Sequence, residues 1–272
     1  MKSLNKWKLV LLAWVIAIGC SKVPVTGRKQ LDIVPNSQVL ALAESEYNEF
    51  IKTNQVIHNT PQAEEVQRVG QKIAIAAEAY LKKEKESKLL DGYKWEFNLV
   101  NDPQVNAWCM PGGKVVVYTG ILPITENDAG LATVMGHEIA HAIARHGNER
   151  MSQGLTAQLG GLALDVALSS KPTETRNLFL AAYGVGTNVG VLLPYSRLQE
   201  SEADRIGLIF MAMAGYDPRE AISFWERMEH ANKGGEPPEF LSTHPSHKTR
   251  IEELKKYMPE ALKYYKETVS RK

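Results

Sequence analysis

Apolar residues recur at helical spacing over most of the chain. Between residues 37 and 51, and again between 62 and 83, they return every three or four positions. In the second segment one face of the expected helix carries Val66, Val69, Ile73 and Ala77. The same period dominates from residue 128 to the C-terminus. This spacing is typical of helices that bury one face against a core, so it predicts a mostly helical protein.

A different pattern between residues 95 and 119 predicts a small sheet. Trp95, Phe97 and Leu99 alternate with polar residues, as in a half-buried strand, and residues 114–119 are rich in β-branched side chains. The Pro-Gly-Gly sequence at 111–113 indicates a turn between two strands. We therefore expect an α+β fold, mostly helical, with one small antiparallel sheet.

The first 28 residues differ from the rest of the chain. Three lysines precede an uncharged apolar run that ends at Gly19-Cys20-Ser21. The run is too short to span a bilayer comfortably and is typical of a signal peptide. Its end resembles a bacterial lipobox, which predicts a signal peptide at 1–19, a lipidated Cys20 with a tether at 20–28, and one domain at 29–272. An ordinary signal peptide or an uncleaved anchor is the alternative.

Charge and cysteine content exclude some functions. The chain has 32 Lys and Arg against 31 Asp and Glu, a net charge of +1, so we expect no nucleic-acid partner. Cys20 and Cys109 are the only cysteines, so we expect no disulfide framework.

The sequence His137-Glu138-Ile139-Ala140-His141 is an HExxH motif. On a helix, positions four apart share a face, so both imidazoles could hold one metal ion with Glu138 beside them as general base. We expect this helix to begin near residues 125–128 and to end at residue 147, with His146 in its last turn. The alternative is an amphipathic helix with two incidental histidines.

A second helix, expected at 196–214, offers the third ligand that a catalytic zinc needs. Glu200 and Asp204 are four residues apart on one face, whereas Glu202 points roughly the opposite way. Glu200 is therefore the expected ligand, and Asp204 the expected acceptor for a ligand imidazole N–H. An ordinary acidic helix face remains the alternative.

Five segments together resemble the gluzincin metallopeptidases of HtpX and CAAX prenyl protease type, and most of all the bacterial lipoprotein branch of LoiP and BepA. They lie at residues 24–31, 101–113, 136–141, 200–204 and 243–251. The resemblance implies a zincin-like fold in which His137, His141 and Glu200 bind one zinc ion and Glu138 is the general base.

The resemblance also suggests a role for His244. It matches a family histidine near the metal, which would either stabilise the oxyanion or occupy the open zinc position in a closed state. Arg250 would steady its loop. The alternative is a loop histidine without a catalytic role.

The segment before Lys114 resembles the family's edge strand beside the active-site helix. Extended polypeptide substrates would pair with it main chain to main chain, with Asn106, Gly112 and Gly113 at the binding site. The alternative is that the two glycines only form a turn.

These observations predict a zinc-dependent endopeptidase that hydrolyses unfolded or misassembled proteins. The lipobox-like ending places it in the bacterial cell envelope, as a periplasmic lipoprotein of the outer membrane that is held to the membrane through Cys20. The chain ends without the C-terminal repeat domain of BepA. The competing hypothesis is a non-proteolytic chaperone or assembly factor with a structural or latent zinc site.

Overall fold

A computed structural model describes residues 20–158, 162–185, 196–231, 238–244 and 249–270. The predicted signal peptide at 1–19 lies outside these residues, so the division of the chain into leader, tether and domain stays a prediction. No helix in the described ranges is both long and apolar enough to cross a membrane.

The described chain is mostly helical, as expected. The α-helices are α2 (Asn36–Thr53), α3 (Pro61–Lys83), α4 (Leu122–Thr125), α5 (Asp128–Ile143), α6 (His146–Gln158), α7 (Leu164–Ser170), α8 (Pro172–Ala182), α9 (Arg197–Met213), α10 (Glu220–Ala231), α11 (Glu239–Thr243) and α12 (Arg250–Val269). Two short 3-10 helices are η1 (Ser87–Leu90) and η2 (Thr119–Ile121). The strands are β1 (Cys20–Lys22), β2 (Lys29–Leu31), β3 (Val56–Ile57), β4 (Glu96–Val100), β5 (Ala107–Met110) and β6 (Lys114–Tyr118).

The strands form two sheets. A two-stranded antiparallel hairpin joins β1 and β2, and a four-stranded sheet has the order β3-β4-β6-β5. The larger sheet is mixed, because β4 runs parallel to β6 while β3 and β5 are antiparallel to their neighbours. The α+β class is therefore confirmed, although the main sheet contains one parallel pair that the sequence did not predict.

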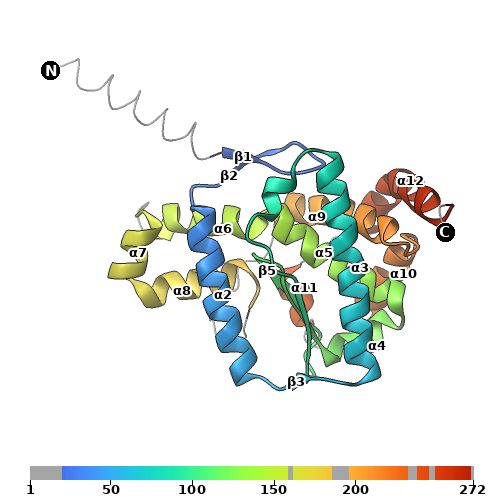
Figure 1. The fold of residues 1–272 in the computed structure, drawn as a ribbon, viewed down its shortest axis with the longest axis horizontal. Coiled ribbons are helices and arrows are strands. Elements are labelled where there is room, and N and C mark those ends of the chain that lie inside the picture. The colour runs from blue at the N-terminus through green and yellow to red at the C-terminus, as the bar shows by residue number, and fades with distance from the viewer. Residues whose placement is uncertain (1–19, 159–161, 186–195, 232–237, 245–248, 271–272) are drawn as a thin grey trace, which may run out of the picture.

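Helices cover both faces of the larger sheet, which lies in the middle of the view in Figure 1. One hydrophobic cluster joins Leu99, Cys109 and Val117 to residues of α3, α5 and α9. The other joins Trp108 and Val116 to residues of α2, α6 and α8. Every residue of β5 and β6 is buried, and apart from Lys114 these strands are apolar without alternation.

The two helices that carry the expected metal ligands pack closely against each other. A Cβ atom at Gly136 of α5 would lie 3.1 Å from the carbonyl oxygen of Gly207 of α9, and one at Gly207 would lie 3.0 Å from the backbone nitrogen of His137. The absence of side chains at both positions therefore brings the two helix backbones together.

Candidate metal centre

Local sequence signals set the limits of α5 and α9. Asn127 caps α5, its side chain accepting from the backbone N–H groups of Ala129 and Gly130, although the sequence suggested residues 125 and 128. Ser196 and Gln199 form the expected capping box at the start of α9. The predicted end of α5 was wrong: the helix stops at Ile143, and Arg145 adopts a left-handed conformation with φ 61° before α6 begins.

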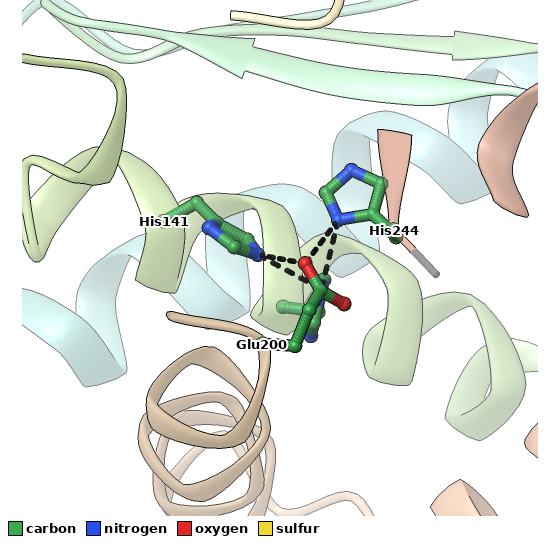
Figure 2. Close-up of side chains that lie close together, drawn as sticks. His141, Glu200 and His244 are labelled. Atoms are coloured by element: carbon green, nitrogen blue, oxygen red, sulfur yellow. Dashed lines mark hydrogen bonds and ion pairs between the residues drawn. The ribbon is translucent and has the colours of Figure 1, made fainter. Parts of the chain in front are cut away.

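Four buried side chains from α5, α9 and the end of α11 converge, and Figure 2 shows how three of them, His141, Glu200 and His244, point toward one another. The four are His137, His141, Glu200 and His244, and each offers a ligand atom within 4.8 Å of the others. The Nε2 atoms of the two α5 histidines are 3.0 Å apart. Glu200 Oε1 lies 3.3 Å from His141 Nε2 and 3.0 Å from His244 Nδ1.

These separations fit one zinc ion. A tetrahedral zinc with bonds of ~2.0–2.1 Å holds its ligand atoms roughly 3.4 Å apart. The donor set of imidazole nitrogens and one carboxylate is also what zinc prefers. The structure therefore brings together the three expected ligands and places beside them His244, which the resemblance expected near the metal.

Outer partners orient two of these ligands. His137 Nδ1 lies 2.9 Å from Asp204 Oδ1, so its N–H points away from the cluster and its Nε2 points into it. Arg250 donates to Asp204 at 2.7 Å and to Glu200 at 2.9 Å. Its guanidinium is fully buried and stacks 3.3 Å from the centre of the Trp225 ring. Arg250 thus positions the Glu200 carboxylate itself, rather than steadying only the loop of His244.

Burial and neighbouring charges shift the pKa values of the cluster residues in different directions. Burial alone would raise the pKa of Glu200, but the charges of His244, His137 and Arg250 hold it well below its ordinary value. Burial lowers the pKa of His137, and the carboxylates of Glu200 and Asp204 more than offset this, raising it to about 9. Burial keeps the pKa of His141 well below its usual range.

Glu138 lies beside the cluster and has the properties of a general base. It is buried, and its Oε1 atom is 3.3 Å from His244 Nε2. Burial raises the pKa of its carboxyl group. A carboxylate with a raised pKa accepts a proton more readily near neutral pH, which general-base catalysis requires.

His244 lies against the other three members of the cluster. Its Nδ1 is 3.2 Å from His137 Nε2, a separation that two ligands of one zinc ion can have. Just before it, the backbone N–H of Phe240 in α11 donates to the carbonyl of Val105 at 3.0 Å. The segment that carries His244 is thus fixed to the chain that leads into β5.

The three predicted substrate-binding residues form hydrogen bonds with the backbone of the sheet region rather than with the metal-site cluster. Asn106 is buried, and its side chain accepts from the backbone N–H of Ala107 at 2.9 Å. The carbonyls of Gly112 and Gly113 accept from the backbone of Lys94 and Glu96, and both glycines have positive φ. These contacts give Asn106, Gly112 and Gly113 a structural role in the turns next to the strands. Their role in substrate binding stays a prediction.

Two residues beside the cluster were not predicted, His146 and Glu202. The sequence placed His146 in the last turn of α5, because the helix was expected to continue through residue 147. The break at Arg145 instead turns His146 back, so that its Nδ1 lies 2.9 Å from His141 Nδ1. Glu202, set aside as pointing away from the metal, lies 3.2 Å from His146 Nε2.

Comparison with known proteins identifies a family. The model of peptidase family M48 matches residues 60–258. The mitochondrial metalloendopeptidase OMA1 of Saccharomyces cerevisiae is 37% identical over 257 residues, 91% of this chain and 71% of its own. Human OMA1 is 32% identical over 274 residues, 95% of this chain and 51% of its own length. The β-barrel assembly-enhancing protease of Escherichia coli is 32% identical over 165 residues, 58% of this chain and 33% of its own.

These relatives correct the predicted location. The expectation of a periplasmic lipoprotein in a bacterial outer membrane was wrong, because the relatives that match most of the chain are mitochondrial proteases, which point to mitochondria. The bacterial lipoprotein branch is likewise not confirmed, since its representative matches a shorter part of the chain. Lipidation of Cys20, the first residue of β1, stays a prediction without structural support.

The type of enzyme and its metal were predicted correctly. Both the family match and the buried cluster of three histidines and one glutamate agree with zinc as the cofactor. The chain belongs to peptidase family M48 and is a zinc metalloendopeptidase.

Proposed function

We propose that this endopeptidase hydrolyses unfolded or misassembled proteins, and that the structure represents its resting state, closed by His244. The observation that carries the proposal is the buried cluster in which His244 takes the fourth ligand position. A catalytic zinc keeps that position open for water or substrate. Proteolysis therefore requires His244 to move, which would limit cleavage to polypeptides that displace it.

The chain's own residues would divide the chemistry among them. His137, His141 and Glu200 would hold zinc, which when bound supplies a Lewis acid for the scissile carbonyl. Glu138 would take the proton of the attacking water and pass it to the leaving amine. Arg250 and Asp204 would keep the ligands in place during this exchange.

The sheet edge beside the site suits an extended substrate. Within the described residues β5 pairs only with β6, so it is an edge strand, and it packs against α5. Such an edge binds peptides through main-chain hydrogen bonds, which read little of the side-chain sequence. That mode suits a protease acting on many unfolded proteins. Because α11 is bonded to Val105, release of α11 would free the approach to the edge strand and move His244.

A binding protein with a structural zinc is the second candidate. A complete set of four protein ligands is what a structural zinc site has, and the cluster offers four. A structural site has no use for a buried carboxylate beside it, however, and Glu138 is there with a raised pKa. Its presence favours the protease.

Replacement of Glu138 separates the two candidates. Glu138→Gln should lower the cleavage rate of unfolded casein about 10²–10⁴-fold while the bound zinc, measured by metal analysis, stays at one per chain. Glu226→Gln, an exposed position on α10, is the matched control and should cleave as the wild type does. No cleavage by any form of the protein would favour the binding protein, whereas full activity in Glu138→Gln would remove Glu138 as the general base.

A further inference from the structure

His146 contacts the side of His141 that faces away from the metal cluster. Its Nδ1 lies 2.9 Å from His141 Nδ1, and both side chains are buried. Its other nitrogen, Nε2, lies 3.2 Å from Glu202 Oε2. The metal-facing Nε2 of His141 is therefore connected through its own ring, and then through His146, to a buried carboxylate on α9.

The chemistry of these groups determines where the protons lie. An ionised carboxylate only accepts hydrogen bonds, so His146 must donate to Glu202 through Nε2–H. The Nδ1 of neutral His146 is then an acceptor, and His141 must donate to it from Nδ1. This arrangement leaves His141 Nε2 without a proton and with its lone pair directed at the cluster, as a zinc ligand needs.

The loop between β1 and β2 holds Glu202 in place. Thr26 Oγ1 donates to Glu202 Oε1 at 2.7 Å, and Arg28 Nε donates to Glu202 Oε2 at 2.9 Å. The two terminal nitrogens of Arg28 bind Glu149 of α6, both at 2.8 Å. Val25 in this loop has φ 68°, a conformation that β-branched residues rarely adopt. Backbone strain of this kind persists where surrounding contacts enforce it.

We propose that the β1–β2 hairpin is a positioning element of the zinc site. Arg28 and Thr26 fix Glu202, Glu202 sets the tautomer of His146, and His146 orients His141 for metal binding. Arg28, Glu202 and His146 are thus positioning residues that act through His141. The proposal rests on the assignment of His141 as a ligand in the proposed function.

The affinity of the full-length protein for zinc tests this proposal without reference to proteolysis. The protein is stripped of metal and titrated with Zn²⁺ in competition with a chromophoric chelator. Loss of an outer partner of a ligand histidine typically weakens metal binding ~10–100-fold, so Glu202→Gln and Arg28→Gln should each weaken it about tenfold or more. Because the Arg28 side chain is 21% exposed, its replacement serves as the variant that leaves the core intact.

An ion pair on the same helix provides the matched control. Arg205 follows Glu202 on α9 and pairs with Glu260 of α12 at 2.8 Å, on the surface of the protein. Glu260→Gln should bind zinc within about twofold of the wild type, a smaller change than the ~10–100-fold loss expected of an outer partner. Arg28→Lys, which keeps the charge, should recover part of the affinity that Arg28→Gln loses.

The visible spectrum of the Co²⁺-substituted protein adds a readout that a purely structural role would not change. Reorientation of His141 should shift the cobalt bands in Glu202→Gln and Arg28→Gln but not in Glu260→Gln. Wild-type affinity and spectra in both Glu202→Gln and Arg28→Gln would overturn the proposal, and so would an equal loss in Glu260→Gln. His141→Ala distinguishes failure of the proposed function from failure of this proposal. If this variant binds zinc as tightly as the wild type, His141 is not a ligand, and both the proposed zinc site and the positioning role of the hairpin fail.

Discussion

Glu200 is the residue on which the charges of the site converge. Its carboxylate is fully buried, accepts from Arg250 at 2.9 Å and lies within 3.5 Å of His137 Nε2. A buried carboxylate with so many cationic neighbours stays ionised, and in that form it binds a metal ion. Removal of this carboxylate should therefore weaken metal binding while α9 stays folded.

Glu200→Ala should bind zinc far more weakly than the wild type. Since loss of an outer partner alone costs ~10–100-fold in metal affinity, loss of a ligand should cost more than about 100-fold, measured by chelator competition. Ser201→Ala is the control, because Ser201 follows on the same helix and contacts Tyr257 instead of the cluster. Zinc retention equal to the wild type in Glu200→Ala would remove this residue from the site.

Spacing along a helix allowed four residues of the site to be found in the sequence. The pairs His137 and His141, and Glu200 and Asp204, are each four apart, so their common face follows from helix geometry alone. His146 could not be found this way, because its position depends on a helix break at Arg145. A non-glycine residue in a left-handed conformation carries little signal in a single sequence.

At the scale of elements, the contact between α5 and α9 determines the spacing of the ligands. The two helices touch at Gly136 and Gly207, where backbone atoms would lie only 3.0–3.1 Å from added Cβ atoms. Any side chain at Gly207 would push α9, with Glu200, away from the histidines of α5.

Gly207→Val should accordingly lower both stability and zinc affinity. Overpacking of this kind costs about 1–3 kcal/mol, which would lower the melting temperature of the metal-free protein by roughly 2–4 °C per kcal/mol. Leu198→Val is the control, since it adds the same branched residue to α9 at an exposed position. If Gly207→Val has the same melting temperature and zinc affinity as the control, the contact between α5 and α9 does not require glycine at this position.

The ion pair between Glu96 and Lys114 makes the stability of the β4–β6 pairing depend on pH. The two residues are partners in the β4–β6 register and form an ion pair, and Tyr47 of α2 donates to Glu96 at 2.9 Å. Burial alone would raise the pKa of Glu96, but the hydrogen bonds from Lys114 and Tyr47 bring it below its ordinary value of 4.5.

A lowered folded-state pKa means that Glu96 stabilises the protein above pH 4.5 and loses this contribution as pH falls through the folded-state value. Glu96→Gln should therefore unfold at lower denaturant concentration near pH 7, and the difference from the wild type should shrink below pH 4.5. Urea titrations at several pH values measure this. A constant difference across the series would show that the ion pair does not contribute to pH-dependent stability.

Local pattern predicted two strands of the larger sheet. Trp95 and Phe97 alternate with polar residues where β4 lies, and the β-branched residues 114–119 indicated β6. By contrast, β5 was expected only from the resemblance of the segment before Lys114 to an edge strand. Because β5 intervenes between β4 and β6 along the chain, those two strands run parallel. Pairing order depends on contacts between distant residues, which local pattern does not encode.

At the scale of the whole molecule, the proposed closure by His244 would determine when the enzyme can act. The ligands, Glu138 and His244 are all at most 3% exposed. Segments far apart in the sequence close the site: α5 and α9 provide the zinc ligands, and the end of α11 provides His244. Under the proposed closure, activity would depend on a movement of α11.

His244→Ala tests whether the enzyme is closed in this way. Removal of the imidazole opens the fourth ligand position while His137, His141 and Glu200 remain, so basal cleavage of casein should rise while zinc stays bound. His58→Ala, at an exposed position, should behave as the wild type. A fall of about a hundredfold or more would instead make His244 a donor to the oxyanion, since loss of one such donor costs ~10²–10³ in turnover. Unchanged activity across a pH series would leave His244 without a part in catalysis or closure, and only a rise with zinc retained supports a resting state that this histidine holds shut.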